Sequence, residues 1–144
     1  MKDNKKTWVI ASVFFIVTMV VAFNFERFTG QAITSSIPPK IYLSASPTVT
    51  NQENCTITAG NRLFVTVETG DKGIKRNGLI YDGKRTSRKL ANLMFDPNCG
   101  GNVCRPKKVT WIRYAIPNGW KGPYCVRVVE SSTNKITEKC FEVK

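Results

Sequence analysis

The sequence contains no histidine among its 144 residues. This absence excludes Ser-His-Asp triads, histidine general bases and histidine metal ligands. No glycine-rich phosphate loop follows a strand and opens a helix. The carboxylates of residues 40–144 are scattered, and nothing in their spacing points to a converging catalytic pair. They are Glu53, Glu68, Asp71, Asp82, Asp96, Glu130, Glu138 and Glu142. We therefore expect a protein that is not an enzyme and that uses no cofactor or metal.

Acidic residues are few, since 10 Asp and Glu stand against 22 Lys and Arg, for a formal net charge of +12. Spread evenly, such charge serves only solubility, whereas concentrated on one sheet face it attracts polyanions. Seven basic residues within 18 positions are the candidate anion contacts: Lys72, Lys75, Arg76, Lys84, Arg85, Arg88 and Lys89. Arg105, Lys107 and Lys108 form a second basic group further along the chain. Tyr81 is a candidate base-stacking residue beside the first group.

Charged residues are absent from Trp8 to Phe23. Residues 7–25 number 19 and would form a helix of about 28 Å, which just crosses a hydrocarbon core of about 30 Å. Lys2, Lys5 and Lys6 precede this run, so the positive-inside rule places residues 1–6 in the cytoplasm and the rest of the chain outside. The run is longer than the apolar part of a cleaved signal peptide, which favours an uncleaved signal-anchor. The alternative is cleavage near the small-x-small pattern that ends at Ala32.

Residues 26–39 are expected to form a juxtamembrane linker, because Pro38-Pro39 favours an extended backbone. Residues 40–144 are then the extracytoplasmic domain. Alternating patterns and turn signals predict about seven strands there, with Ile41, Leu43, Ala45, Leu63, Val65 and Val67 pointing inward. In the strand over 109–116, the inward set is either Ile112, Tyr114 and Ile116 or Val109 and Trp111. The pattern predicts an antiparallel sandwich, with a small barrel as the alternative.

The last 26 residues predict a hairpin with a cysteine in each strand. Successive side chains of a strand point to opposite faces, so burying Tyr124 and Phe141 turns both cysteines away from the core. A four-residue loop over 131–134 sets Cys125 opposite Cys140 and Glu130 opposite Lys135, whose charges would then neutralise each other. We therefore predict a cross-strand disulfide between Cys125 and Cys140.

The chain has five cysteines, which suggests disulfides in an exported domain. Cys99 and Cys104 enclose a tight loop and are predicted to pair. Cys55 is then left over, to stay free, to pair between chains or to displace one of the predicted pairs. A zinc site of the other four cysteines is the competing interpretation, although the usual CxxC knuckles are absent.

The segment over 116–128, IPNGWKGPYCVRV, resembles the end of immunoglobulin-like and fibronectin-type-III-like domains of prokaryotic surface proteins. In those domains a P…G-x-Y-x-V-x-V run leads into the penultimate strand, and the match here covers residues 109–144. Two features depart from antibody domains: Tyr124 directly precedes Cys125, and the expected disulfide joins neighbouring strands. The basic N-terminus, single apolar span and small cysteine-bearing domain look like small single-pass archaeal surface proteins. The resemblance implies adhesion, assembly or ligand display and carries over no catalytic residue.

Asn54-Cys55-Thr56 is an N-glycosylation sequon on the expected outer side of the membrane. Asn54 is therefore the candidate glycosylation residue.

These patterns together predict a single-pass cell-membrane protein whose C-terminal domain lies outside, as a non-catalytic interaction or envelope-structural domain with a basic surface. Its expected partners are the membrane and a polyanion or surface-layer protein, and no small-molecule substrate is indicated. Two alternatives remain: a subunit of a pilus-like or secretion assembly, and a secreted polyanion-binding protein released by signal cleavage. Against the pilin alternative, no Gly or Ala stands at the junction before Trp8.

Overall fold

The computed structural model describes residues 35–48, 51–85 and 88–144, and these residues form strands and no helix. Seven strands are five to eight residues long: β1 (Lys40–Ser44), β3 (Arg62–Glu68), β5 (Asn77–Asp82), β6 (Lys89–Met94), β9 (Val109–Ala115), β10 (Gly122–Val129) and β11 (Ile136–Val143). Four strands have two residues each: β2 (Thr56–Ile57), β4 (Ile74–Lys75), β7 (Cys99–Gly100) and β8 (Val103–Cys104). The prediction of an all-β domain is confirmed for the described residues.

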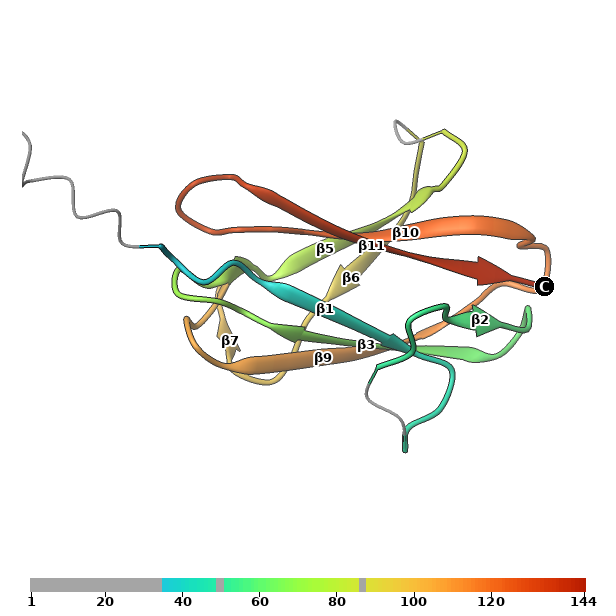
Figure 1. Ribbon diagram of the computed structural model, residues 1–144, viewed down its shortest axis with the longest axis horizontal. Coiled ribbons are helices and arrows are strands. Elements are labelled where there is room, and N and C mark those ends of the chain that lie inside the picture. The colour runs from blue at the N-terminus through green and yellow to red at the C-terminus, as the bar shows by residue number, and fades with distance from the viewer. Residues whose placement is uncertain (1–34, 49–50, 86–87) are drawn as a thin grey trace, which may run out of the picture. The chain divides into compact units, whose positions relative to one another are not determined.

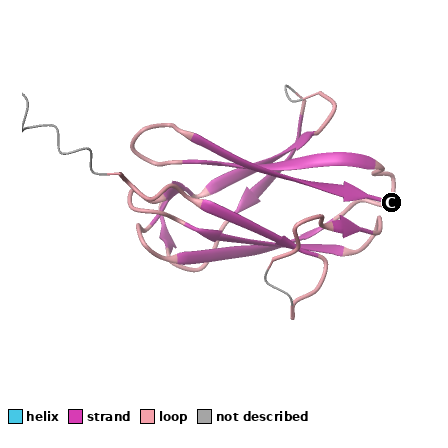
Figure 2. Cartoon of the chain, in the orientation of Figure 1, coloured by secondary structure: helices cyan, strands magenta, loops and turns pink. Residues whose placement is uncertain are grey.

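Two sheets form the layers of a β-sandwich (Figures 1 and 2). One sheet has the order β1-β3-β9, and the other has the order β2-β11-β10-β5-β6. A small third sheet, β4-β8-β7, lies at one end. The described ladders are antiparallel except that β2 runs parallel to β11, so the expectation of a wholly antiparallel sandwich is wrong at β2. β2 has only two paired residues and lies in a polar, turn-rich stretch, so its hydrophobic periodicity is too short to predict a strand.

Side chains from both layers meet in one hydrophobic core. As predicted, Leu63, Val65 and Val67 of β3 are fully buried, and they face β10 residues such as Val126 across the sandwich. The largest fully buried side chains are Phe95, Leu43, Ile57, Leu63, Ile74, Ile80, Leu93, Ile116, Val65, Val67, Val126 and Val128. This alternation is what a half-buried strand requires, because its side chains point to opposite faces.

The first strand ends earlier than the sequence indicates. Ile41 and Leu43 are buried as predicted, but Ala45 is exposed, so that prediction is wrong. The reason is a local turn, since the backbone N–H of Ser46 donates to the Ser44 hydroxyl at 3.0 Å. Such a side-chain bond competes with the strand ladder and stops the alternation.

The final hairpin has the predicted register. Tyr124 lies opposite Phe141 and Cys125 lies opposite Cys140. The N–H of Glu130 donates to the carbonyl of Lys135 at 2.8 Å, which closes the loop over 131–134. The expected charge neutralisation is wrong, however, because the buried Glu130 carboxylate accepts a hydrogen bond from the Thr133 hydroxyl instead.

The structure also decides which face of β9 points inward. Ile112 and Tyr114 pack on the core and Ile116 is 2% exposed. Val109 and Trp111 lie on the outer face with 47% and 46% of their surface exposed. Both sets are apolar, so the sequence pattern alone leaves this choice open.

Aromatic rings close the core at the start of β10. The Trp120 ring stacks on Tyr124 with centroids 4.4 Å apart and lies 6.0 Å from Tyr114. The Tyr124 hydroxyl accepts a hydrogen bond from the Lys121 N–H at 3.0 Å and donates to the Lys121 carbonyl at 3.3 Å. Trp120 therefore caps the core.

The predicted N-terminal segments lie outside the described residues: the cytoplasmic residues 1–6, the signal-anchor helix over 7–25 and most of the linker over 26–39. No helix long and apolar enough to cross a membrane occurs in the described part of the chain.

The last linker residues are described, and Ile37 makes two hydrogen bonds with Asp71. The Ile37 N–H donates to the Asp71 carboxylate at 2.8 Å, and the Ile37 carbonyl accepts from the Asp71 N–H at 3.0 Å.

The core predicts a clear contrast between an inward and an outward position of β3. Leu63→Ala should lower the free energy of unfolding by about 2–5 kcal/mol, because it leaves a cavity between the two sheets. Thr66→Ala, on the outer face, should change it by less than about 0.5 kcal/mol. Urea unfolding of the full chain, followed by tryptophan fluorescence, measures both, and equal losses would contradict the described layering.

Candidate functional site

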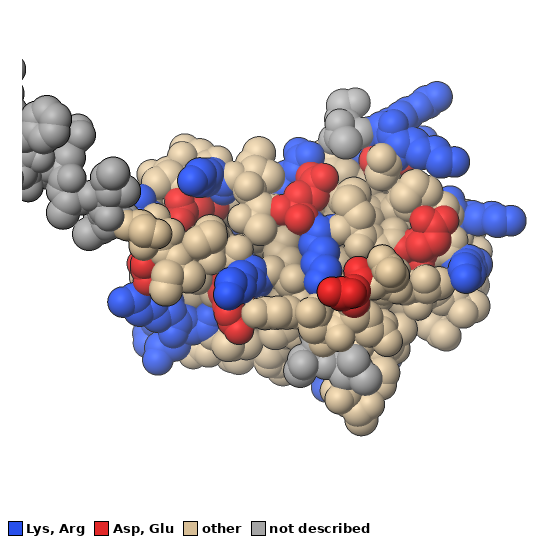
Figure 3. All heavy atoms as spheres, viewed as in Figure 1, with Lys and Arg blue, Asp and Glu red and all other residues tan. Residues whose placement is uncertain are grey.

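The seven candidate anion contacts fall into two groups at opposite ends of β5. Lys72, Lys75 and Arg76 precede the strand, and the other four residues lie in the β5–β6 turn and at the first position of β6. Six strand residues separate the groups by roughly 20 Å. Figure 3 shows Lys and Arg side chains grouped at the lower left and at the upper right, with others between them on the same face. The structure therefore provides two basic surfaces in place of the single one that the sequence spacing suggests.

The basic surface that follows β5 is here named the turn cluster, and it consists of Lys84, Arg85, Arg88 and Lys89. All four residues are exposed. The turn is held at its base, because the Lys84 N–H donates to the Asp82 carboxylate at 2.9 Å and the Gly83 N–H donates to the Pro123 carbonyl at 2.8 Å.

The basic surface that precedes β5 is larger than predicted, because loops far apart in the sequence meet there. β4 pairs with β8, which sets Lys75 opposite Val103. The Lys107 N–H donates to the Gly70 carbonyl at 2.7 Å, so the residues after β8 lie against the residues before β4. We call the combined surface the basic end, and its members are Lys72, Lys75, Arg105, Lys107 and Lys108.

Arg76 is a structural residue at the margin of the basic end. Its Nε donates to the Phe95 carbonyl at 3.1 Å, and its Nη1 donates to the Gly101 carbonyl at 3.5 Å. The guanidinium thus joins the end of β6 to the loop between Cys99 and Cys104. These backbone acceptors occupy donors that an anion would otherwise use.

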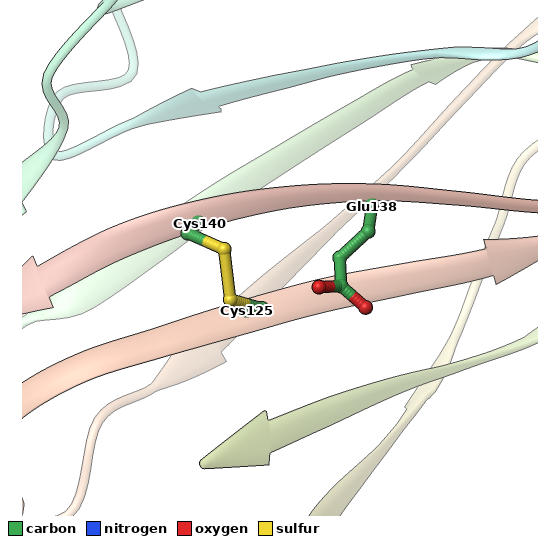
Figure 4. A group of neighbouring side chains, drawn as sticks. All are labelled: Cys125, Glu138 and Cys140. Carbon is green, nitrogen blue, oxygen red and sulfur yellow. A yellow bond between two sulfur atoms is a disulfide. The ribbon is translucent and has the colours of Figure 1, made fainter. Parts of the chain in front are cut away.

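Both predicted disulfide pairs are present, Cys99–Cys104 and Cys125–Cys140. The Cys125–Cys140 disulfide lies on the outer face of the five-stranded sheet, as the strand parity predicts (Figure 4). Cys140 is exposed, whereas Cys125 is only 4% exposed although it points away from the core. Cys125 is buried because it lies on β10, the central strand of the sheet. The neighbouring strands place Tyr81 on one side of Cys125 and Cys140 on the other.

An ion pair and an aromatic ring lie beside this disulfide. The Arg127 guanidinium bonds the Glu138 carboxylate through Nη2 at 2.7 Å and Nε at 2.8 Å. The same guanidinium covers the Tyr81 ring at 4.1 Å from its centroid. That contact occupies a face of the ring that base stacking would need, so Arg127 and a nucleobase would compete for it.

Cys125, Glu138 and Cys140 are the one group of potential metal ligands that converges in the described part of the chain, with ligand atoms within 4.8 Å of one another. Figure 4 shows the Glu138 carboxylate beside the disulfide. The two sulfurs are bonded to each other and the carboxylate is paired with Arg127, so the set offers no free thiolate. The alternative of a four-cysteine zinc site is wrong in this structure, because the two cysteine pairs belong to different sheets.

The sequon lies at the start of β2. Asn54 and Thr56 are exposed, whereas Cys55 between them is buried in the core and is not in a disulfide. Burial raises the pKa of the Cys55 thiol above its usual value of 9.0, and the nearby Lys139 ammonium lowers that pKa in part. Cys55 is thus a small apolar core residue at neutral pH.

The sequence did not point to an aromatic surface on the outer face of the β1-β3-β9 sheet. The Arg113 guanidinium lies over Trp111 and Phe64, 5.4 and 5.6 Å from the ring centroids. A cavity of about 480 Å³ borders Trp111 where the edges of β6 and β9 approach each other, lined also by Met94, Asp96 and Pro97. The outward direction of Phe64 was predictable, but that of Trp111 depended on the face of β9.

In comparisons with known proteins, no protein-family model matches this chain and no similar curated protein was found.

The two disulfides should stabilise the domain to different degrees. Cys125 and Cys140 are 15 positions apart and Cys99 and Cys104 are 5 apart. Loop-closure entropy then predicts a loss of about 3 kcal/mol for the Cys125→Ala/Cys140→Ala variant and about 2 kcal/mol for Cys99→Ala/Cys104→Ala. Urea unfolding measures both losses, and a larger loss for the shorter loop would contradict this order.

The buried Cys55 thiol predicts a pH dependence. Its pKa is raised on folding, so the unfolded chain releases this proton first and rising pH favours unfolding. The wild-type chain should lose stability relative to Cys55→Ala above about pH 9, by at most about 1.4 kcal/mol per pH unit. Parallel stability curves from pH 7 to above 10, an interval that spans the usual thiol pKa of 9.0, would contradict this assignment.

Proposed function

We propose that this protein is a membrane-tethered, extracytoplasmic interaction or envelope-structural domain without catalytic activity. The observation that carries the proposal is the Cys125–Cys140 disulfide, whose Cys140 side is exposed on the outer face of the sheet. Exposed disulfides persist in oxidising compartments and are reduced in the cytosol. A domain that contains such an exposed disulfide is suited to the outside of the cell.

The apolar run over 7–25 supports the tether. Its length matches a single membrane crossing, and the lysines before it favour a cytoplasmic N-terminus. Residues 26–39 would then link the span to the sandwich, which would lie on the outer side.

The connectivity of the strands supports an immunoglobulin-like sandwich. Lettering the seven longer strands A, B, C, C′, E, F and G in chain order puts A, B and E in one sheet and G, F, C and C′ in the other. Tyr124, at the start of strand F, bonds the backbone of Lys121 three residues upstream through its hydroxyl. A tyrosine near the start of strand F with this bond is a feature of immunoglobulin-related domains, although Tyr124 lies one residue closer to the following cysteine than in antibody domains.

Contact with an anionic partner, a polyanion or a surface-layer protein, fits the described side chains better than catalysis does. Several carboxylates are already engaged: Asp71 by Ile37 and Lys107, Glu138 by Arg127 and Glu130 by Thr133. The cations of the basic end and of the turn cluster are exposed in contrast, with Lys107–Asp71 the one ion pair found among them in the described residues. Exposed, clustered cations raise the local concentration of anionic partners.

The N-terminus of the chain in the membrane fraction tests the tether. We expect an intact Met1 or Lys2 by N-terminal sequencing, and resistance of the protein to extraction by high salt. A cut near Thr7 would instead indicate a pilin-like subunit, and a cut near Ala32 would indicate a released polyanion-binding protein. Non-reducing peptide mapping of the same sample should recover both disulfides, and free thiols at Cys125 and Cys140 would contradict an extracytoplasmic domain.

A further inference from the structure

The basic end carries an unusual concentration of unpaired positive charge. Residues 68–76 and 103–109 contain six Lys and Arg against two carboxylates, Glu68 and Asp71. The Asp71 carboxylate lies 3.7 Å from the Lys107 ammonium and also accepts the Ile37 N–H. Lys72, Lys75, Arg105 and Lys108 are exposed, and none of them has an ion-pair partner within the described residues.

Apolar side chains are exposed among these cations. Ile37, Val103 and Val109 keep 57%, 47% and 47% of their surface exposed, and they belong to the segments that form this end. A groove of about 430 Å³ runs beside two of them. Its walls include Ile37, Val109, Lys107 and Lys108, together with the carboxylates Glu68 and Asp71. Exposed apolar residues surrounded by cations are what a protein surface needs to enter the headgroup region of a bilayer.

The basic end is also held rigidly. The Thr69 hydroxyl donates to the Arg105 carbonyl at 2.6 Å, and the Cys99–Cys104 disulfide closes the adjacent loop. Gly73 has a φ of +69°, and a Cβ there would meet the Cys104 carbonyl at 2.4 Å, so only glycine allows the two segments to pack this closely. Their cations are thus carried on a backbone that is already ordered before any partner arrives.

We propose that the basic end docks on anionic lipid headgroups of the leaflet outside the cell, with Ile37, Val103 and Val109 entering the interface. This inference rests on the proposed membrane tether and names the partner of one of the two basic surfaces. The turn cluster, at the far end of β5, takes no part in this contact.

The place where the linker joins the sandwich favours lipid headgroups over other polyanions as the partner of the basic end. Ile37 is hydrogen-bonded to Asp71, so the polypeptide that follows the predicted span joins the sandwich at the basic end. The residues between 25 and 37 reach at most about 40 Å when fully extended. A short tether keeps this end at a high effective concentration next to headgroups, which no diffusing polyanion matches.

Phosphodiester chemistry fits the side chains present. Lysine ammonium groups bind phosphate as point charges, and the Arg105 guanidinium offers a planar, bidentate fork. Each cation near an anionic surface strengthens attachment by about fivefold, so four together contribute more than about a hundredfold. The attraction should weaken as salt rises, because charges further apart than about 8 Å are screened at physiological ionic strength.

Lysine acetylation footprinting of the full chain tests this docking. The chain is placed in nanodiscs of phosphatidylcholine alone or of phosphatidylcholine mixed with phosphatidylglycerol, and each lysine is quantified by mass spectrometry. We expect Lys72, Lys75, Lys107 and Lys108 to react about fivefold more slowly in the anionic discs, and Lys84 and Lys89 to react equally in both. High salt should remove the difference.

Two variants with equal charge loss provide matched controls. Lys72→Ser, Lys75→Ser, Arg105→Ser and Lys108→Ser together should abolish the protection of Lys107. Lys84→Ser, Arg85→Ser, Arg88→Ser and Lys89→Ser together should leave that protection unchanged. If the first variant does not fold, the comparison of the two groups of lysines in the wild-type chain still decides the question.

Three results would overturn the inference: equal reactivity of Lys72 and Lys75 in both discs, loss of Lys107 protection with the turn-cluster variant, or stronger protection by dextran sulfate added to neutral discs. The last result would assign the basic end to a soluble polyanion. A failure of the membrane tether looks different, because the chain would then not co-purify with nanodiscs of either composition.

Discussion

The register of the β10–β11 hairpin is the constraint on which the rest of the domain depends. It pairs Cys125 with Cys140 on the outer face and Tyr124 with Phe141 on the inner face, so one alignment fixes the disulfide and part of the core together. A shift by one residue would turn both sets to the wrong faces. β10, the central strand, also pairs with β5, which carries this register across the five-stranded sheet.

The outer and inner faces of that sheet serve different purposes. The inner face packs against β1 and β3 to form the core, with Tyr124 and Trp120 closing one side of it. The outer face carries the disulfide and the Arg127–Glu138 pair, which bonds side chains of the same two strands. The hairpin is therefore joined by its ladder, by a covalent bond and by an ion pair.

The two basic surfaces lie at the ends of the sandwich, where loops meet. Strands leave little freedom to their side chains, because their faces are committed to the core or to cross-strand contacts. Loops bring residues together from remote parts of the chain, as Gly70 and Lys107 show through their backbone hydrogen bond. The basic end and the turn cluster are thus separate surfaces.

The sequence by itself determined the all-β class, the inward residues of β3 and the Cys125–Cys140 disulfide, because a period of two fixes which side chains share a face. It also determined the Cys99–Cys104 disulfide, because these two cysteines enclose a tight loop. It also identified the basic residues as a class. Only the tertiary structure decided the inward face of β9, the parallel pairing of β2 and the bond that Glu130 makes to Thr133. It alone separated Lys75 from Lys84 and joined Lys75 to Lys107, because proximity between loops depends on how strands far apart in the chain are ordered across a sheet.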